Sequence, residues 1–530
     1  MKSLFIAQLP IDLASAKDSN PTDVRMDGGA LYPSQFVIAL IKYSRAQMIY
    51  FPQTPLRRWA DIRSTDTFLT NVDRIRFFPL SALSSLSYET DLILLSTGWH
   101  LEDLLMSRSA LRGQPRPACA LTHSLCSPSL LNTLLLLRMS PAREYDALVC
   151  SSRAGRQALD TMFNMISERC ELAGTRLPDW KLALPIIPLG VDIEDGQRAR
   201  MADKHTCNLL YFGRLATNSK GDLRPVLVAF STLLQEGLRA HLIIAGDDTQ
   251  SNLTPLLTEF ARALGCKEHV TIFPNPTSID KKNLFDLADI FISPSNSIQE
   301  QFGIALVEAM KAGLAVVASN WSGHRDIVVH GETGFLADTL FPAVADEPAE
   351  IVGPMRSDSF AEATSIDLGQ MVSYLRLLIS DPLLRKRFGA AAKQRVRTLY
   401  NWKRVIGMHD DLWDELRAEA VSTNASQRND GVQFERWTPQ KLFGGFATRS
   451  WKSNTRVMVS NLPTGMKEII CRSLADESVT NASLAGLLDQ LQKRGECMVG
   501  DLSRQLGDSL QDLVHSLGIL AKHGLIVVAN

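Results

Sequence analysis

The sequence has almost no excess of charge of either sign: 56 basic and 57 acidic residues give a formal net charge of -1. No global field therefore directs the chain to nucleic acid or to an acidic membrane. The longest apolar run, LLNTLLLLRM, is about half the length of a bilayer span. The eight cysteines are scattered without a C-x-x-C pair, which predicts free thiols in a reducing cytoplasm rather than disulfides or a metal site.

Short apolar runs alternate with helix-length amphipathic stretches, and this series occurs twice. The runs are 3–9, 46–52, 91–97, 118–123 and 146–152, and then 208–214, 240–248, 269–275, 288–295 and 314–320. Continuous apolar strands separated by helices predict parallel sheets covered on both faces. We expect an α/β fold of two doubly wound, Rossmann-like lobes, residues 1–195 and 205–420, facing a crevice that holds the ligand.

A third, small and mainly helical domain is expected at 432–530, after a long helical stretch at 381–420 and a polar linker at 421–431. Its end has the helix, turn, helix and strand order of a winged-helix unit. The last helix is mostly apolar and nearly neutral, which argues against DNA binding. Acceptor recognition and self-association into a homo-oligomer both stay open.

Two acidic residues lie eight positions apart around a predicted helix start. Glu300 follows the strand at 288–295, Gly303 opens the helix, and Glu308 lies after its first turn. The free N–H groups at a helix start attract phosphate, so the two carboxylates could bind hydroxyls on either side of a diphosphate. A surface acid beside a helix-capping acid is the simpler alternative.

Two cations follow the first strand of the second lobe. Gly213-Arg214 ends that strand, and Lys220 precedes the next helix. A guanidinium can bind two phosphate oxygens at once, and lysine supplies a compact positive charge. Each could be an ordinary surface cation, but the carboxyl ends of strands are where α/β sheets bind ligands.

Several such motifs occur together in a fixed order. They are G-R-L with K-G (213–215, 220–221), I-A-G-D (244–247), the E-x7-E motif with its F-G (Glu300, Phe302, Gly303, Glu308), E-A-M-K-A-G (308–313) and S-G-H-R-D-I-V-x-x-G-x-x-G (322–334). In these motifs the second lobe resembles the retaining glycosyltransferases of family 4, which have the GT-B fold. The resemblance is strong over 205–340 and weak in the first lobe. One departure is Ala315, where the family usually has proline.

The resemblance implies a metal-independent enzyme without a cofactor that moves a sugar from a nucleoside-diphosphate sugar. Arg214 and Lys220 are expected to hold the diphosphate, Glu308 the ribose, and Glu300 the sugar. The backbone near Phe302, Gly303 and Ile304, and Gly213, complete the expected donor site. The acceptor is open: a glycan, a lipid-linked sugar, a small metabolite or a peptide, with peripheral membrane attachment also open.

The first lobe offers fewer candidates. Gly28 and Gly29 follow the first strand, and adjacent glycines allow a loop to approach a ligand closely, although a plain turn explains them equally well. His123 matches the position where the family often has a histidine facing the donor sugar, and we count it with Glu300, Arg214 and Lys220 as catalytic. His100 is a weaker alternative, and a partly buried structural histidine is the simpler interpretation of either.

Two other functions remain open at this point. A sugar phosphorylase or nucleotide-sugar epimerase could have the same architecture. A non-catalytic nucleotide-sugar-binding protein acting through the C-terminal domain is the second, although the intact Arg214, Lys220, Glu300 and Glu308 argue against a decayed site.

Overall fold

The computed structural model describes most of the chain. The described residues are 2–8, 28–52, 66–78, 86, 91–108, 116–122, 125–126, 130–177, 182–193, 206–217, 220–342, 357–422, 451–463, 481–506 and 510–529. Among the predicted site residues, His123 lies outside them. Both lobes belong to one compact unit, and a second unit consists mainly of residues 433–530.

The first lobe contains a six-stranded sheet in the order β3-β2-β1-β4-β5-β6, with every pair parallel. Its strands are β1 (Lys2–Gln8), β2 (Met48–Pro52), β3 (Ile75–Phe78), β4 (Asp91–Ser96), β5 (Ala118–Leu121) and β6 (Ala147–Val149). Its helices are α1 (Gly28–Tyr43), α3 (Asp66–Leu69), η3 (Val72–Arg74), α4 (Leu101–Arg108), α5 (Leu130–Met139) and α6 (Arg153–Leu172). The central strand β4 is buried from Leu92 to Leu95, as its continuous apolar sequence predicts.

The second lobe repeats this sheet, in the order β12-β11-β10-β7-β8-β9 and again parallel. Its strands are β7 (Cys207–Phe212), β8 (Ala240–Gly246), β9 (Val270–Pro274), β10 (Ile290–Ser293), β11 (Ala315–Ser319) and β12 (Gly334–Ala337). Its helices are α7 (Arg224–Gln235), α8 (Thr254–Ala263), η5 (Lys267–His269), α9 (Ser278–Leu287), α10 (Ile304–Lys311), α11 (His324–Ile327), α12 (Ser357–Ala363), α13 (Leu368–Ser380) and α14 (Pro382–Leu399). β13 (Thr339–Leu340), which follows β12, forms a short antiparallel pair with β14 (Ser365–Ile366), which lies between α12 and α13.

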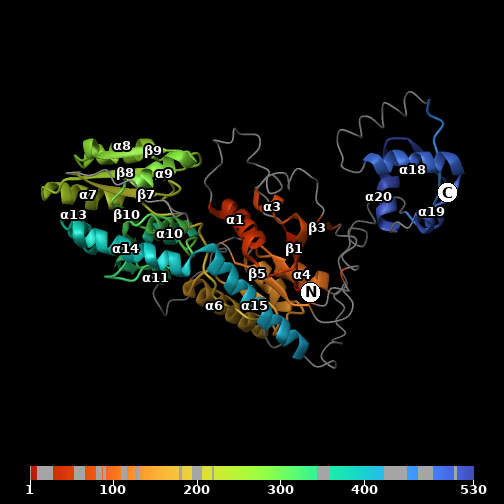
Figure 1. The fold of residues 1–530 in the computed structure, drawn as a ribbon, viewed down its shortest axis with the longest axis horizontal. Helices are drawn as coiled ribbons and strands as arrows, with labels where there is room; N and C mark the ends of the chain where they lie inside the picture. Colours follow the sequence, from red (N-terminus) through yellow and green to blue (C-terminus); the bar gives the residue numbers. More distant parts are fainter. Residues whose placement is uncertain are drawn as a thin grey trace. The chain divides into compact units, whose positions relative to one another are not determined.

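The predicted fold class is therefore confirmed: both lobes are doubly wound α/β units (Figure 1). In each, the strand order reverses between the first and the fourth strand, β1 and β4 or β7 and β10. Ligands of such sheets bind beyond the carboxyl ends of the strands at this reversal. The edge strands β3 and β12 were not among the predicted strands, because an arginine interrupts the apolar run of β3 and β12 is short and begins with glycine.

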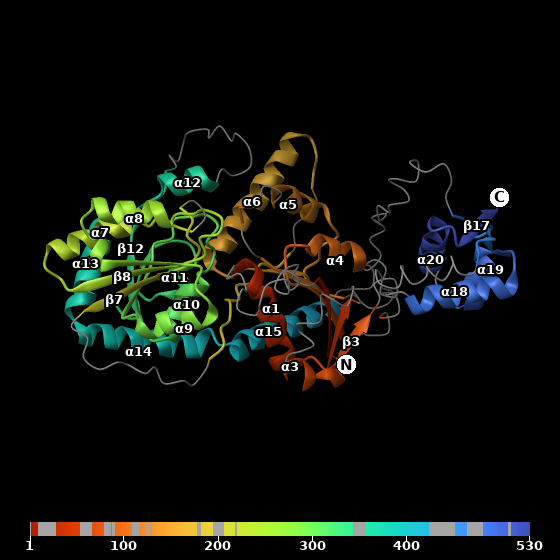
Figure 2. The same ribbon diagram turned by 90° about the horizontal axis from the view of Figure 1, so that it is seen from above.

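The helical stretch predicted at 381–420 is two helices rather than one. It breaks at Tyr400 and Asn401, between α14 and α15 (Trp402–Ser422), and α15 then packs on α1 of the first lobe (Figures 1 and 2). The break pairs with the end of the first lobe, since Val191 N donates to Tyr400 O and Trp402 N donates to Val191 O. Gly190 faces the indole of Trp402, and a Cβ there would lie 2.4 Å from the ring. The Gly190-Val191-Asp192 segment thus joins the two lobes.

The buried contact between α15 and α1 makes stability depend on pH. His409 is fully buried, its ring lies 5.1 Å from that of Phe36, and burial lowers its pKa to about 3. Below about pH 6.5 the unfolded chain binds a proton at His409 that the folded chain does not bind. The contribution of His409 to the free energy of unfolding is therefore complete above pH 6.5 and decreases as the pH falls towards 3.

We expect His409→Leu to remove this part of the acid sensitivity. Between pH 7.5 and 5 the wild type should lose about 2 kcal/mol more unfolding free energy than the variant, at about 1.4 kcal/mol per pH unit below 6.5. Urea unfolding at both pH values measures it. The exposed His269→Leu is the control, and equal losses in wild type and His409→Leu would contradict the prediction.

The C-terminal unit has its own core. Strand β15 (Arg456–Val459) lies between β16 (Cys497–Met498) and β17 (Ile526–Ala529), and both pairs are antiparallel. Helices α18 (Asn481–Arg494), α19 (Val499–Leu506) and α20 (Leu510–Lys522) supply most of the buried leucines, among them Leu491, Leu502 and Leu517. The helix, helix and strand expected at the end of the chain are present as α19, α20 and β17.

The apolar run predicted not to span a membrane forms the ten-residue helix α5. Within the described ranges, none of the helices combines the length and the apolar character that crossing a bilayer requires. The seven described cysteines all carry free thiols.

Candidate donor site

The loop after β7 is fixed by close backbone contacts. Gly213 N donates to Ala245 O at 3.1 Å, which holds the end of β7 against β8. Gly221 packs on the loop after β10, where a Cβ would lie 2.7 Å from Pro294 O. Only glycine allows this approach, and the approach brings the preceding residue, Lys220, to the loop that carries Glu300.

Lys220 and Glu300 meet at the strand-order reversal of the second lobe. Their Nζ and Oε2 atoms are 3.2 Å apart, with 33% and 14% of the two side chains exposed. Burial by itself raises the pKa of Glu300, but the charges of Lys220 and His324 and hydrogen bonds from Lys220 and the Phe302 backbone bring it below its usual value. The sequence placed these two residues at one site, and the structure brings them into contact.

Gly303 caps α10 in a conformation that favours glycine. Its φ is +108°, and a Cβ there would lie 2.8 Å from Cδ2 of His324. The His324 ring is fully buried and has Ser319 Oγ 3.3 Å from Nδ1 and Ser293 Oγ 3.5 Å from Nε2. Burial lowers the pKa of His324, although the Glu300 carboxylate opposes that shift. This ring supports the start of α10, a role that the sequence did not reveal.

Glu308 lies on α10 as expected, but it has a partner that the sequence did not indicate. Lys281 of α9 places Nζ 2.7 Å from Glu308 Oε1, and about a quarter of each side chain is exposed. Lys281 Nζ also lies 5.4 Å from the ring centre of Phe212, at the end of β7. The carboxylate is therefore held in place beside the end of β7.

The other predicted second-lobe residues differ in burial and in which of their groups a ligand could contact. Arg214 follows Gly213 and is partly buried, with its carbonyl accepting from the Tyr211 hydroxyl. Phe302 is buried and packs edge-on against Tyr400, so its side chain is part of the core and only its backbone is available to a ligand. Ile304 is the first residue of α10, where helix N–H groups are free of intrahelical partners.

In the first lobe, Gly28 and Gly29 differ from the expectation. They are the first two residues of α1 rather than part of a loop, because the helix begins directly at Gly28. Their backbone N–H groups belong to a helix start, which attracts anions, whereas the expectation rested on the close approach of a glycine loop. The prediction for His123 is untested, since it lies outside the described residues.

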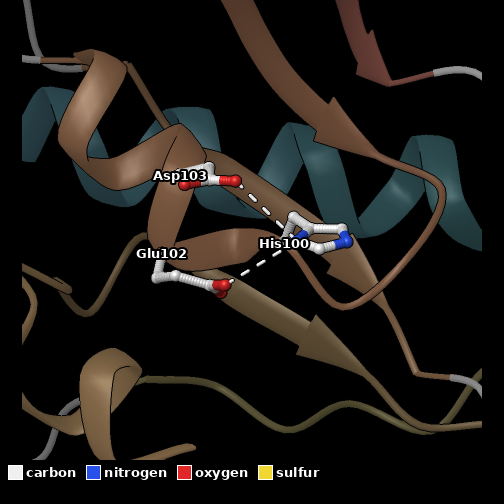
Figure 3. A group of neighbouring side chains, drawn as sticks. All are labelled: His100, Glu102 and Asp103. Atoms are coloured by element: carbon white, nitrogen blue, oxygen red, sulfur yellow. Dashed lines mark ion pairs between the residues drawn. The ribbon is translucent and has the colours of Figure 1, made fainter. Parts of the chain in front are cut away.

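His100 lies just before α4 and faces two acidic side chains of that helix (Figure 3). Its Nδ1 is 3.8 Å from Glu102 Oε1 and 3.7 Å from Asp103 Oδ2. Among the described residues these three form the one group whose ligand atoms lie close enough together for a metal ion. Half of the His100 side chain is exposed, and acids in a first helical turn also complement the helix dipole.

One contact between the lobes was not predicted. Arg153, the first residue of α6, donates from its backbone N and its Nε to the carboxylate of Asp326, at 2.7 and 2.5 Å. Asp326 belongs to the S-G-H-R-D motif, whose Gly323 packs on the backbone of residues 301 and 302. The start of a first-lobe helix thus lies against the turn that supports the donor loop.

The region that carries these contacts has known relatives. Residues 198–344 match the family model of glycosyl transferases group 1. The matched residues include the Lys220–Glu300 pair, Glu308 and the supporting turn at 322–326. The second lobe therefore contains a glycosyl transferases group 1 domain.

Individual relatives cover part of the chain. Phosphatidyl-myo-inositol mannosyltransferase of Mycobacterium tuberculosis is 28% identical over 219 residues, covering 41% of this chain and 50% of the relative. GDP-mannose:cellobiosyl-diphosphopolyprenol alpha-mannosyltransferase of Komagataeibacter xylinus is 31% identical over 163 residues, covering 29% and 40%. The chain thus spans half or less of the length of these two relatives.

Similarity of fold extends over more of the chain. HepE of Anabaena, solved in complex with UDP, superposes with a TM-score of 0.50 at 15% identity, covering 78% of this chain and all of HepE. At this identity the likeness concerns the fold, and it includes both lobes.

Proposed function

We propose that this protein is a retaining, metal-independent glycosyltransferase that moves a sugar from a nucleoside-diphosphate sugar to an acceptor. The observation that carries the proposal is the contact between Lys220 and Glu300, 3.2 Å apart beside the start of α10, within the residues that match glycosyl transferases group 1. Cations and a helix start favour a diphosphate, and carboxylates favour sugar hydroxyls.

The proposed chemistry needs no covalent intermediate on the protein. The acceptor hydroxyl attacks the anomeric carbon from the face that the diphosphate leaves, and a departing phosphate oxygen takes the hydroxyl proton. Arg214, Lys220 and the α10 N–H groups stabilise the charge that develops on the phosphate. Glu300 and His123 position the sugar, and Glu308, held by Lys281, binds the ribose.

The proposal extends to the rest of the chain. We assign 1–195 to the acceptor side and 205–420 to the donor side, although α15 packs on the first lobe. The relatives' names include a lipid acceptor and a diphosphopolyprenol acceptor. Such acceptors fit a cytoplasmic enzyme with peripheral membrane attachment.

For residues 432–530 we propose a winged-helix-like module that binds the acceptor or a second copy of the chain. Its order of strand, helix, strand, helix, helix and strand, with the three strands in one antiparallel sheet, supports this proposal. The mainly apolar α20 disfavours nucleic acid. The molar mass of the intact chain by light scattering separates the two roles, because only self-association yields a dimer.

A nucleotide screen tests the proposed function. Melting temperatures of the wild type are measured with UDP, GDP, ADP, CDP and dTDP, with and without magnesium. A nucleotide at a hundred times its Kd should add about 2.7 kcal/mol to stability. We expect one nucleotide to raise the melting temperature of the wild type whether or not magnesium is present. The same nucleotide should not raise the melting temperature of the Arg214→Ala/Lys220→Ala variant.

The sugar derivative of that nucleotide is then incubated with candidate acceptors, and the anomeric configuration of the product is determined by NMR. An inverted product would contradict the retaining mechanism. Turnover only with inorganic phosphate in place of nucleotide would favour a phosphorylase, and nucleotide-sugar binding without turnover on a broad acceptor panel would favour the non-catalytic alternative.

A further inference from the structure

The loop between β10 and α10 contains an unusual concentration of buried polar atoms without partners. Ser295 Oγ, Asn296 Oδ1, and both Oε1 and Nε2 of Gln301 make no hydrogen bond with any described residue. Four of the nine such side-chain atoms in the described part of the chain thus lie within residues 295–301. Buried polar atoms in folded proteins are nearly always paired, so a concentration of exceptions indicates a place where a ligand or water binds.

Gln301 stands out within this loop because its whole carboxamide is unpaired. The residue is 7% exposed and follows Glu300, the partner of Lys220. An amide that is buried with neither its donor nor its acceptor satisfied is destabilising, so the free protein retains it at an energetic cost. The sequence motif did not single it out, since Glu300, Phe302 and Gly303 carry the resemblance.

The position of the Gln301 side chain is defined by both lobes. A Cβ on Gly155, in the first turn of α6, would lie 3.7 Å from Gln301 Oε1 and 4.0 Å from its Cδ. On the other side, Gly323 packs on the Gln301 backbone, with a Cβ there 2.2 Å from Gln301 O. The Arg153–Asp326 ion pair connects these same two elements. The carboxamide is therefore held at the junction of the lobes and next to the proposed donor site.

The chemistry of a carboxamide suits a hydroxyl group. It offers one acceptor oxygen and two N–H donors, and a hydroxyl can pair with either. The diphosphate is expected to pair with the positive charges of Lys220 and Arg214 rather than with this neutral carboxamide. We propose that Gln301 binds a hydroxyl group of the transferred sugar and determines which sugars the enzyme accepts. This inference rests on the proposed function, and it assigns to one residue of this chain the recognition of the sugar.

The test separates recognition of the sugar from recognition of the nucleotide. Titration calorimetry measures binding of UDP and UDP-glucose, and of GDP and GDP-mannose, to the wild type and to Gln301→Leu. Leucine has a similar size and removes both unpaired atoms. We expect the affinity for the nucleotide sugar to fall about three- to tenfold, as for loss of one or two hydrogen bonds, and the affinity for the free nucleotide to stay unchanged. Melting temperature without ligand should not fall.

A matched control is Gln299→Leu, the same change two residues earlier, at a partly exposed position. It should leave both affinities unchanged. A second measurement compares transfer rates with UDP-glucose and UDP-galactose, or with GDP-mannose and GDP-glucose. The two sugars of each pair differ only in the orientation of one hydroxyl group. The wild type should prefer one sugar of the pair, and Gln301→Leu should reduce that preference.

Three outcomes would overturn the inference. Unchanged binding of the nucleotide sugar in Gln301→Leu, or an equal loss for nucleotide and nucleotide sugar, would show that the carboxamide does not contact the sugar. A rise in the acceptor KM alone would assign it to the acceptor instead. If the wild type binds none of the nucleotides, the proposed function itself fails, and this result is distinct from the other three.

Discussion

Replacing Lys220 with alanine should lower kcat/KM for sugar transfer by about 10²- to 10³-fold, the range expected when one preorganised charge-stabilising group is removed. Lys220 Nζ lies 3.2 Å from Glu300 Oε2, so its ammonium group is already positioned before any donor binds. Negative charge develops on the diphosphate as the sugar leaves, and a fixed cation stabilises it most at that point. The loss should therefore appear mainly in kcat, measured by nucleotide release.

A double-mutant cycle distinguishes lost catalysis from a damaged site. Lys220→Ala leaves the mostly buried Glu300 carboxylate without its cation, which is unfavourable, whereas Lys220→Ala/Glu300→Gln removes both charges. The double variant should regain melting temperature relative to Lys220→Ala without regaining activity. The exposed Lys282→Ala is the matched control and should retain wild-type kcat. A Lys220→Ala variant with nearly normal kcat would exclude the proposed role.

Much of the fold could be predicted because parallel strands buried on both faces are continuous apolar runs. Strands such as β4 and β8 have this pattern over most of their length, and buried neighbours cover both faces. The edge strand β3 was missed because its sequence, IRFF, contains an exposed arginine and has one neighbouring strand. β12 is short, and its glycine resembles a turn signal.

The sequence placed candidate residues that share an element, and the strand ends and family motifs placed Lys220 near Glu300. Contacts that join elements outside those motifs were missed. Glu300, Gly303 and Glu308 occupy one loop and helix, so their spacing was informative. The pairing of Glu308 with Lys281 joins α10 to α9, and no local pattern indicates it. The same holds for Gln301 against Gly155, which lies in the other lobe. Contacts of this kind depend on the packing of the whole unit.

The helix break between α14 and α15 illustrates how tertiary packing overrides local preference. Residues 381–420 have a nearly uninterrupted helical sequence, yet Tyr400 and Asn401 leave the helix to pair with Val191. Trp402 then packs on Gly190 and Tyr32 of the first lobe. The aromatic contact buries large apolar surfaces, which outweighs the loss of a few helical hydrogen bonds. The chain thereby returns to the first lobe after completing the second.

Replacing Asp146 with alanine should have the largest effect on stability. Asp146 is fully buried, and its carboxylate accepts from Arg108 Nη1 at 2.6 Å and from the backbone N of Ala118 and Arg143, both at 2.8 Å. Although burial raises the pKa of Asp146, these donors oppose that shift. Its removal leaves three donors, one buried and two partly buried, without this acceptor.

The expected loss for Asp146→Ala is about 3–5 kcal/mol of unfolding free energy, the range for breaking one side of a buried ion pair. Urea unfolding of the intact chain measures it, and faster hydrogen exchange in β5 should accompany it, because Ala118 begins that strand. Asp160→Ala is the control: Asp160 is half exposed, 3.7 Å from Arg156, and should change stability by less than about 0.5 kcal/mol. A loss below 1 kcal/mol for Asp146→Ala, on the order of a surface change, would contradict the assignment.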